Sequence, residues 1–283
     1  MNAQITNGTL TATVSTRGAE LIGLQKDGRE VLWCGDPAVW GFHAPILFPI
    51  CGGLKDDKYL FHGKEYSLKK HGYARTTEFE IESQSDGSVT FLHRSDDETL
   101  KQYPFRYEFR VVYTLSGSTL RVDYRVKNPS EQELFFSVGA HEGFACPEGI
   151  EEYSILFEQP EDLDSTILVG NLLDRKTRNL GHGVCELPLK YEYFEVDAQV
   201  FLSLKSRSVT LVNRKTGAKV GVDFPDHDAF LLWTKPGAKY VCLEPWCGCP
   251  DFVDSDGNLE HKELMIRLNA GEETVRSHTI RIG

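Results

Sequence analysis

The feature that most constrains the fold of this chain is an alternation of apolar and polar side chains with a period of two. Apolar residues occupy every second position from Phe105 to Leu115 and again from Thr119 to Lys127. The residues between these runs, Ser116-Gly117-Ser118, are typical of a tight turn, so we expect a hairpin. Since successive side chains of a strand point to opposite faces, each run predicts a strand with one buried face.

The same period recurs along the chain, whereas helical periodicity is scarce. Only Ser95–Tyr103, just before Pro104, predicts a short helix. About fifteen strands, with turn residues every 8–12 positions, predict an all-β chain folded as a large antiparallel β-sandwich. No linker, composition shift or internal repeat divides the chain, so we expect residues 1–283 to form one domain. Further strands are expected at Gly8–Ser15, Glu78–Glu82, Ser88–His93, Leu134–Ala140, Tyr153–Phe157, Val200–Leu204, Val209–Val212, Lys219–Phe224, Phe230–Thr234, Tyr240–Glu244, Lys262–Asn269 and Thr274–Ile282.

The charge of the chain limits its partners. Asp and Glu number 42 against 31 Lys and Arg, which gives a net charge of −11. Nucleic acids and anionic membranes are bound by clustered Lys and Arg, so we expect neither as a partner. No apolar run approaches the ~20 residues of a membrane span, and Met1–Thr6 lacks the pattern of a signal peptide. A neutral small molecule suits such a chain at least as well as an anion.

The cysteines predict a cytoplasmic protein. There are seven, an odd number scattered along the chain, which does not fit a secreted disulfide framework. Only Cys247 and Cys249 are close in sequence, and their C-x-C spacing is not that of a zinc or thioredoxin-like site. We therefore expect reduced, mostly buried thiols and no metal site.

Glu244 is an acidic residue at an unusual position in the sequence. It ends the apolar run that begins at Tyr240, and Pro245 and Trp246 follow at once. An ionised side chain is rarely left among apolar neighbours unless it is paired or functional. Burial would also raise the pKa of this carboxyl, which suits a general acid or base.

Two histidines also interrupt strand-like sequence. His71 and His141 are each expected at a strand end or in the loop beside it, where a rigid sheet can position catalytic groups. If the strand that begins at Leu134 continues to His141, Gly139 shares its face and leaves room for a ligand. In the strand of Glu244, the same face carries Tyr240 and Cys242, so a sugar ring would find an aromatic wall beside a carboxylate.

Three segments occur in a characteristic order: His-Gly-Tyr-Ala-Arg (71–75), Gly-Ala-His-x-x-Phe (139–144) and Leu-Glu-Pro-Trp-x-Gly-x-Pro-Asp (243–251). Together they resemble the motifs of the aldose 1-epimerases, the galactose mutarotase-like family, and are most similar to its LacX-like bacterial branch. The resemblance extends from about Val31 to the C-terminus.

The resemblance implies a β-supersandwich and a mutarotase that needs no cofactor. By motif position, Glu244 would be the general base and His141 the general acid. His71 would contact the sugar near its ring oxygen, and Arg75 and Asp197 would also bind the substrate. Candidate walls for stacking on the sugar are Trp246, Phe144 and Tyr240.

The chemistry of these residue types agrees with that role. Interconversion of α and β anomers requires removal of a proton from the anomeric hydroxyl and donation of one to the ring oxygen. A carboxylate base and a histidine acid on opposite sides of the sugar are sufficient. The required ordering has the carboxylate ionised and the histidine protonated, which their ordinary pKa values allow near neutrality.

Two positions depart from the pattern of the resembled branch. Gly53 stands where an Arg is common, so we expect Lys55 or Arg75 to replace that sugar contact. Glu142 follows His141 where Pro is common, and a second carboxylate there could raise the pKa of His141 or alter specificity. The preferred sugar therefore cannot be transferred from relatives.

Several alternatives remain open at this point. A hexose-phosphate mutarotase would need basic groups around the phosphate, for which the candidates are Lys55, Lys69, Lys70 and Arg75. A carbohydrate-binding or sensor protein of the same fold would need no turnover. A glycoside hydrolase could pair Glu244 with Asp251 or Asp197, and two histidines with Glu244 could hold a metal. We expect a small-molecule sugar as the partner and a monomer or homodimer.

Overall fold

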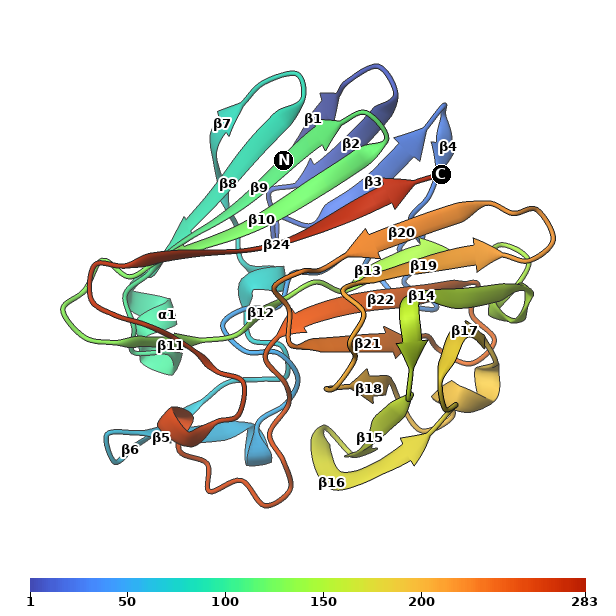
Figure 1. Ribbon diagram of the computed structural model, residues 1–283. Coiled ribbons are helices and arrows are strands. Elements are labelled where there is room, and N and C mark those ends of the chain that lie inside the picture. Colours follow the sequence, from blue (N-terminus) through green and yellow to red (C-terminus); the bar gives the residue numbers. More distant parts are fainter.

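The computed structural model describes residues 1–283 and is built largely of antiparallel strands (Figure 1). The largest sheet has nine strands in the order β17-β14-β19-β20-β24-β10-β9-β8-β7. Its strands are β7 (Glu80–Gln84), β8 (Ser88–Arg94), β9 (Glu108–Ser116), β10 (Thr119–Lys127), β14 (Tyr153–Glu161), β17 (Val184–Pro188), β19 (Ser208–Asn213), β20 (Lys219–Asp223) and β24 (Glu273–Ile282).

A second sheet of seven strands has the order β12-β22-β21-β18-β15-β16, with β13 also paired to β22. In Figure 1, β24, β20 and β19 run above β22 and β21 of this sheet. Its strands are β12 (Val138–Gly139), β13 (Glu142–Ala145), β15 (Asp164–Val169), β16 (Leu172–Asn179), β18 (Gln199–Phe201), β21 (Ala229–Trp233) and β22 (Tyr240–Cys247).

The remaining elements are short. A four-stranded sheet and two strand pairs flank the large sheets, and the helices are one α-helix and five 3₁₀ turns. They are β1 (Asn2–Thr6), β2 (Leu10–Ser15), β3 (Leu21–Lys26) and β4 (Arg29–Glu30); β5 (Lys58–Phe61) with β6 (Lys64–Ser67); β11 (Leu134–Phe136) with β23 (Ile266–Leu268); α1 (Asp97–Gln102); and η1 (Lys55–Asp57), η2 (Ala74–Thr76), η3 (Ile150–Glu152), η4 (Tyr191–Phe194) and η5 (Leu259–His261). None of these helices has the length and apolar character needed to cross a membrane.

The main core joins the two large sheets. A contiguous cluster of 62 buried residues includes Phe109 and Tyr124 of the nine-stranded sheet and Val241 and Leu243 of the other. Each sheet contributes alternate side chains to this layer, as the period of two predicts. The predicted all-β, antiparallel sandwich is confirmed.

The predicted hairpin is confirmed, with β9 and β10 paired from Ser116 and Thr119 back to Glu108 and Lys127. The predicted short helix is α1. It begins after Asp96, whose side chain accepts a hydrogen bond from the Thr99 backbone N–H, while the Thr99 hydroxyl accepts from Asp96 N–H. This reciprocal capping box satisfies backbone donors that a helix start leaves free.

Two of the predicted strands differ in a way that matters for the site. The strand expected at Leu134–Ala140 is divided into β11 and β12, and a further strand, β13, starts only at Glu142. The strand expected to end at Glu244 instead continues through Pro245 to Cys247. Only residues 266–268 of the predicted strand Lys262–Asn269 are extended in a sheet, because Glu263 and Leu264 form a turn in which Leu264 has a φ of +55°.

Candidate active site

Glu244 lies within β22, at the point where the neighbouring strand is interrupted. On one side β22 pairs continuously with β21, with Leu231 opposite Glu244 and Phe230 opposite Pro245. On the other side it pairs with β12 up to Gly139 and with β13 from Glu142. The interruption coincides with Pro245, which has no N–H for a partner strand. His141 occupies this gap.

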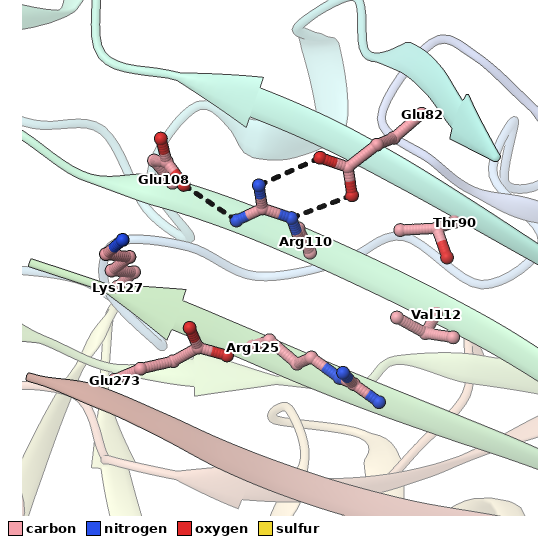
Figure 2. A pocket seen from close by; sticks show the side chains of 8 residues that line it. All are labelled: Glu82, Thr90, Glu108, Arg110, Val112, Arg125, Lys127 and Glu273. Carbon is pink, nitrogen blue, oxygen red and sulfur yellow. Dashed lines mark hydrogen bonds and ion pairs between the residues drawn. The ribbon is translucent and has the colours of Figure 1, made fainter.

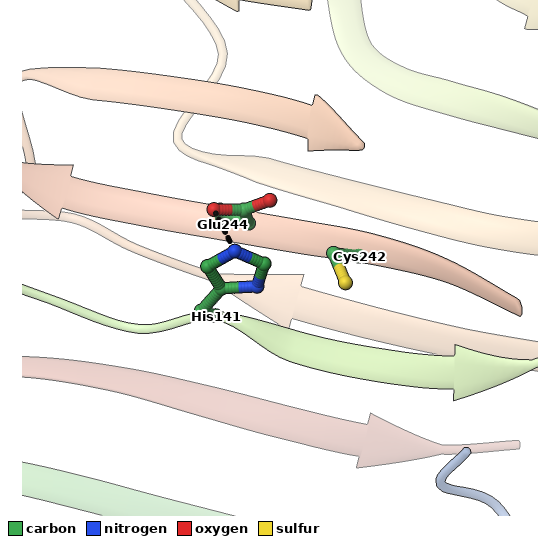
Figure 3. Close-up of side chains that lie close together, drawn as sticks. All are labelled: His141, Cys242 and Glu244. Carbon is green, nitrogen blue, oxygen red and sulfur yellow. Dashed lines mark ion pairs between the residues drawn. The ribbon is translucent and has the colours of Figure 1, made fainter. Parts of the chain in front are cut away.

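Glu244 and His141 form a close pair in the floor of a pocket of about 310 Å³. His141 Nε2 lies 3.3 Å from Glu244 Oε2, and both residues are buried (Figure 3). The remaining atoms, His141 Nδ1 and Glu244 Oε1, make no hydrogen bond with the protein. The two groups are therefore side by side, and their facing atoms are too close for a sugar to lie between them.

The face predicted for Gly139 and His141 is the pocket face, but the room above Gly139 is filled. A Cβ at Gly139 would lie 2.6 Å from the Trp246 indole, and a Cβ at Gly143 would lie 2.8 Å from the Trp40 indole. The absence of a side chain at Gly139 and Gly143 thus leaves space for the indoles of Trp246 and Trp40. The Trp40 ring stacks on the imidazole with centroids 5.1 Å apart.

His71 is held in a strained backbone conformation with one ring nitrogen fixed. Its φ of +70° lies in the left-handed region, which residues other than Gly adopt mainly where the surroundings enforce it. Nδ1 accepts a hydrogen bond from the Gly52 N–H at 3.2 Å, so the neutral ring carries its proton on Nε2. Burial, followed by the nearby His141, holds the pKa of His71 well below its usual range. His71 is therefore a neutral donor at the pocket.

The polar wall of the pocket contains Lys70, Arg75 and Asp197. Lys70 Nζ lies 3.8 Å from Asp197 Oδ2, and the Arg75 guanidinium donates to the Lys70 carbonyl at 3.1 Å. Arg75 makes no salt bridge with Glu78 or with any other carboxylate, which leaves most of its donors available. Lys55 does not line the pocket; its ammonium group donates to the Ser255 carbonyl. The prediction that Lys55 replaces the sugar contact of the Arg that is common at position 53 is therefore wrong.

The two departures from the family pattern have separate structural reasons. A Cβ at Gly53 would lie 2.7 Å from the Cβ of Asn171, so the loop between β15 and β16 closes over Gly53 where a longer side chain would project. Asn171 lines the pocket in its place. Glu142 does not face His141 but pairs with His278, with Oε1 and Nε2 2.8 Å apart. The expectation that Glu142 raises the pKa of His141 is wrong, because burial instead lowers that pKa to about 3.

The aromatic walls were only partly predicted. Trp246 lines the pocket as expected, but Phe144 lies in the main core and Tyr240 is fully buried behind Trp40. Trp40 and Trp233 form the rest of the wall. Trp233 could have been found from strand pairing, because its place opposite Cys242 puts it on the same face as Glu244.

A second hollow of about 290 Å³ lies on the nine-stranded sheet, but its charges neutralise one another. Figure 2 shows Arg110 there between Glu82 and Glu108. Its guanidinium donates to both carboxylates at 2.8 Å. The alternative carboxylate Asp251 is also engaged elsewhere, since its Oδ1 accepts from the buried ammonium of Lys262 at 2.8 Å. Asp251 is therefore not a partner for Glu244.

Burial shifts the pKa values of both Glu244 and His141. It lowers the pKa of His141 to about 3 and raises the pKa of Glu244 well above its ordinary value. Both shifts disfavour the charged form of the buried group. Burial thus favours the neutral imidazole of His141 and the protonated carboxyl of Glu244.

We expect the buried carboxyl to reduce stability as the pH rises. Because the pKa of Glu244 is raised by folding, its contribution is fully present below about pH 4.5, its ordinary pKa, and is lost above it. Glu244→Gln has no carboxyl to ionise at this position. Its free energy of unfolding, relative to that of the unsubstituted protein, should therefore increase with rising pH by up to about 1.4 kcal/mol per pH unit. Urea unfolding of both proteins across the pH range measures it, and a difference that does not change with pH would contradict the prediction.

Comparison with known proteins shows the family of this chain. The sequence pattern of the family described as aldose 1-epimerase matches residues 1–281. The chain belongs to the aldose 1-epimerase family. Its relatives include the plasmid-encoded protein LacX of Lactococcus lactis subsp. lactis, which is 35% identical over 100% of this chain and 99% of the relative.

Solved structures of the aldose 1-epimerase family share the fold. A galactose mutarotase related enzyme from Lactobacillus acidophilus is 34% identical, with a TM-score of 0.95 over 100% of this chain and 97% of that one. A galactose mutarotase-like protein from Lactobacillus casei is 27% identical, with a TM-score of 0.93 over 100% of both chains. The galactose mutarotase-like fold and the enzyme class, an aldose 1-epimerase-like isomerase, are thus confirmed.

Proposed function

We propose that this protein interconverts the α and β anomers of a free aldose by general acid–base catalysis. The observation that carries the proposal is the buried pair of Glu244 and His141, whose facing atoms are 3.3 Å apart in the pocket floor. The anomeric hydroxyl oxygen and the ring oxygen share one carbon atom. Two groups this close together can therefore reach both oxygens of one sugar.

The proposed reaction needs no group beyond the side chains of the pocket. Glu244, as carboxylate, takes the proton of the anomeric hydroxyl while His141, as imidazolium, gives one to the ring oxygen. The bond between the anomeric carbon and the ring oxygen breaks, and an open-chain aldehyde forms. After rotation about the bond to the next carbon, the same steps in reverse close the ring on the other face and restore both protons.

The remaining polar groups bind the sugar in this proposal. His71 Nε2 donates to the substrate near its ring oxygen, while Arg75 and Asp197 contact other hydroxyls. Trp246, Trp40 and Trp233 supply apolar faces for the sugar ring. We also propose that residues 1–283 act as one domain, as a monomer or homodimer in the cytoplasm, where the seven unpaired cysteines of the structure would stay reduced.

A phosphorylated aldose is the second candidate substrate, because Arg75 faces the pocket without a carboxylate partner and Lys70 lies beside it. Two observations favour the free sugar. Lys55 and Lys69 do not line the pocket, and Lys70 is already beside Asp197. A phosphate would therefore find one unpaired cation instead of a cluster.

Saturation-transfer NMR of anomer exchange across a panel of aldoses and aldose phosphates tests the proposal. We expect exchange of at least one free aldose to be accelerated, with kcat/KM no lower than for its phosphate. If a phosphate is preferred more than tenfold and Arg75→Gln removes that preference, the second candidate is correct. If the protein accelerates exchange of no sugar, it is a binding or sensor protein.

A further inference from the structure

A third donor group lies beside the acid–base pair. Cys242 is two residues before Glu244 on the same face of β22, and Figure 3 shows its thiol next to the His141 ring. One donor atom from each of His141, Cys242 and Glu244 lies within 4.8 Å of the others, and all three residues are buried. The proposed reaction uses two of these groups and gives the thiol no task.

The three side chains have free coordination capacity. His141 Nδ1 and Glu244 Oε1 make no hydrogen bond with the protein. The buried thiols of Cys146, Cys247 and Cys249 each donate to a backbone carbonyl, whereas those of Cys51 and Cys242 donate to none. Of these two, Cys242 is the one grouped with His141 and Glu244. Buried polar atoms usually have partners, so a free imidazole nitrogen and a free carboxylate oxygen beside an unengaged thiol indicate that something else can satisfy them.

From this geometry we propose that His141, Cys242 and Glu244 form a binding site for a thiophilic divalent cation such as Zn²⁺, and that bound cation blocks the pocket. Zinc takes one nitrogen, one sulfur and one carboxylate oxygen at about 2.0–2.3 Å, which places tetrahedral ligands about 3.5 Å apart. The donor atoms of the three residues already lie within 4.8 Å of one another, so small side-chain rotations bring them to this spacing. Rotation of the Cys242 side chain would bring its sulfur closer to the other two donor atoms. The fourth coordination position of the ion would face the pocket.

The charges of the site select the cation. A thiolate and a carboxylate together neutralise a divalent ion, and neutral His141 binds through a ring lone pair. Formation of the metal–sulfur bond releases the thiol proton of Cys242 to solvent, and the carboxyl proton of Glu244 is released where it is present. A soft thiolate favours Zn²⁺, Co²⁺ or Cd²⁺ over Mg²⁺ and Ca²⁺, which prefer oxygen ligands only.

Cation binding and catalysis exclude each other in this proposal. The ion would hold both the base and the acid, so neither could exchange a proton with a sugar. The proposed cation site depends only on the geometry of the three side chains, whereas the proposed inhibition also rests on the proposed function. The binding experiment therefore uses a spectroscopic readout that is independent of turnover.

Titration of the full chain with Co²⁺ tests the site. The exposed cysteines are replaced first, as Cys34→Ser and Cys185→Ser, so that surface thiols do not contribute. We expect a thiolate-to-cobalt charge-transfer band that saturates at one equivalent, is displaced by Zn²⁺ and is absent in Cys242→Ser. Cys146→Ser, which alters an equally buried thiol of the main core, is the matched control and should keep the band.

Inhibition is measured on the same proteins. We expect Zn²⁺ to abolish anomer exchange reversibly, with recovery on addition of EDTA, and Cys242→Ser to be more than about tenfold less sensitive. A saturating sugar substrate should displace Co²⁺ from the unsubstituted pocket, a measurement that does not depend on any buried variant folding. The proposal is overturned if no charge-transfer band forms, or if the band is unchanged in Cys242→Ser. A protein that binds Co²⁺ but turns over no sugar would overturn only the proposed function.

Discussion

Glu244→Gln is expected to lower kcat for anomer exchange by about 10²–10⁴-fold, the usual contribution of a positioned acid or base. The amide fills the same space in the floor of the pocket but cannot take the anomeric proton. KM should change much less, because Arg75, His71 and Asp197 still contact the sugar. Polarimetry at several enzyme concentrations, corrected for spontaneous mutarotation, gives both constants.

The control for this variant distinguishes the loss of the proposed base from the loss of any one negative charge. Glu82→Gln makes the same substitution in the ion-paired hollow of the nine-stranded sheet, and it should leave kcat unchanged. His141→Gln should be as damaging as Glu244→Gln, and the double variant hardly worse than either, because the two groups act as a unit. Full activity of Glu244→Gln would remove the base assignment, and additive losses would show that the residues act separately.

Asp251→Asn is expected to lower the free energy of unfolding by about 3–5 kcal/mol, because it leaves a buried ammonium without its counter-charge. Lys262 and Asp251 are both buried, and Lys262 Nζ donates to Asp251 Oδ1 and to the Cys249 carbonyl, each at 2.8 Å. Asp251 Oδ2 also accepts from the Lys55 N–H at 3.0 Å. This carboxylate therefore joins three segments beneath the pocket wall at Pro250.

The matched control is Asp254→Asn, which breaks an exposed pair with Arg175. Exposed pairs contribute little, so its effect should be no more than about 1 kcal/mol. Urea denaturation measures both variants. Lys262→Met in the Asp251→Asn background should recover part of the loss, because the unpaired charge is then removed. Equal effects of the two Asn variants would contradict the assignment of a buried ion pair.

The sequence predicted the architecture well because a period of two is a local property. Each half of the hairpin formed by β9 and β10 shows its buried face within its own residues. The face shared by Gly139 and His141 followed from the same rule. The break between β12 and β13 did not, because it depends on which strand lies alongside and on the missing N–H of Pro245.

The sequence predicted which polar residues lie together in the pocket, but it did not predict how the pocket is packed. Glu244, His141, His71, Arg75, Asp197 and Trp246 all line the pocket. Trp40 was missed because it lies in an irregular segment, and only the space above Gly143 brings its indole onto His141. The direction of Glu142 was likewise beyond the sequence, since its partner His278 is 136 residues away.

The floor and the walls of this pocket are held by different parts of the chain. Glu244 belongs to β22, which is bonded to neighbours along both edges, whereas Lys70, Asn171 and Asp197 are carried by connecting segments. Substitutions or insertions in those segments can change which sugar fits while leaving the acid–base pair in place. Reaction and selectivity can thus diverge independently, so new substrate ranges are accessible to this scaffold without any loss of its chemistry.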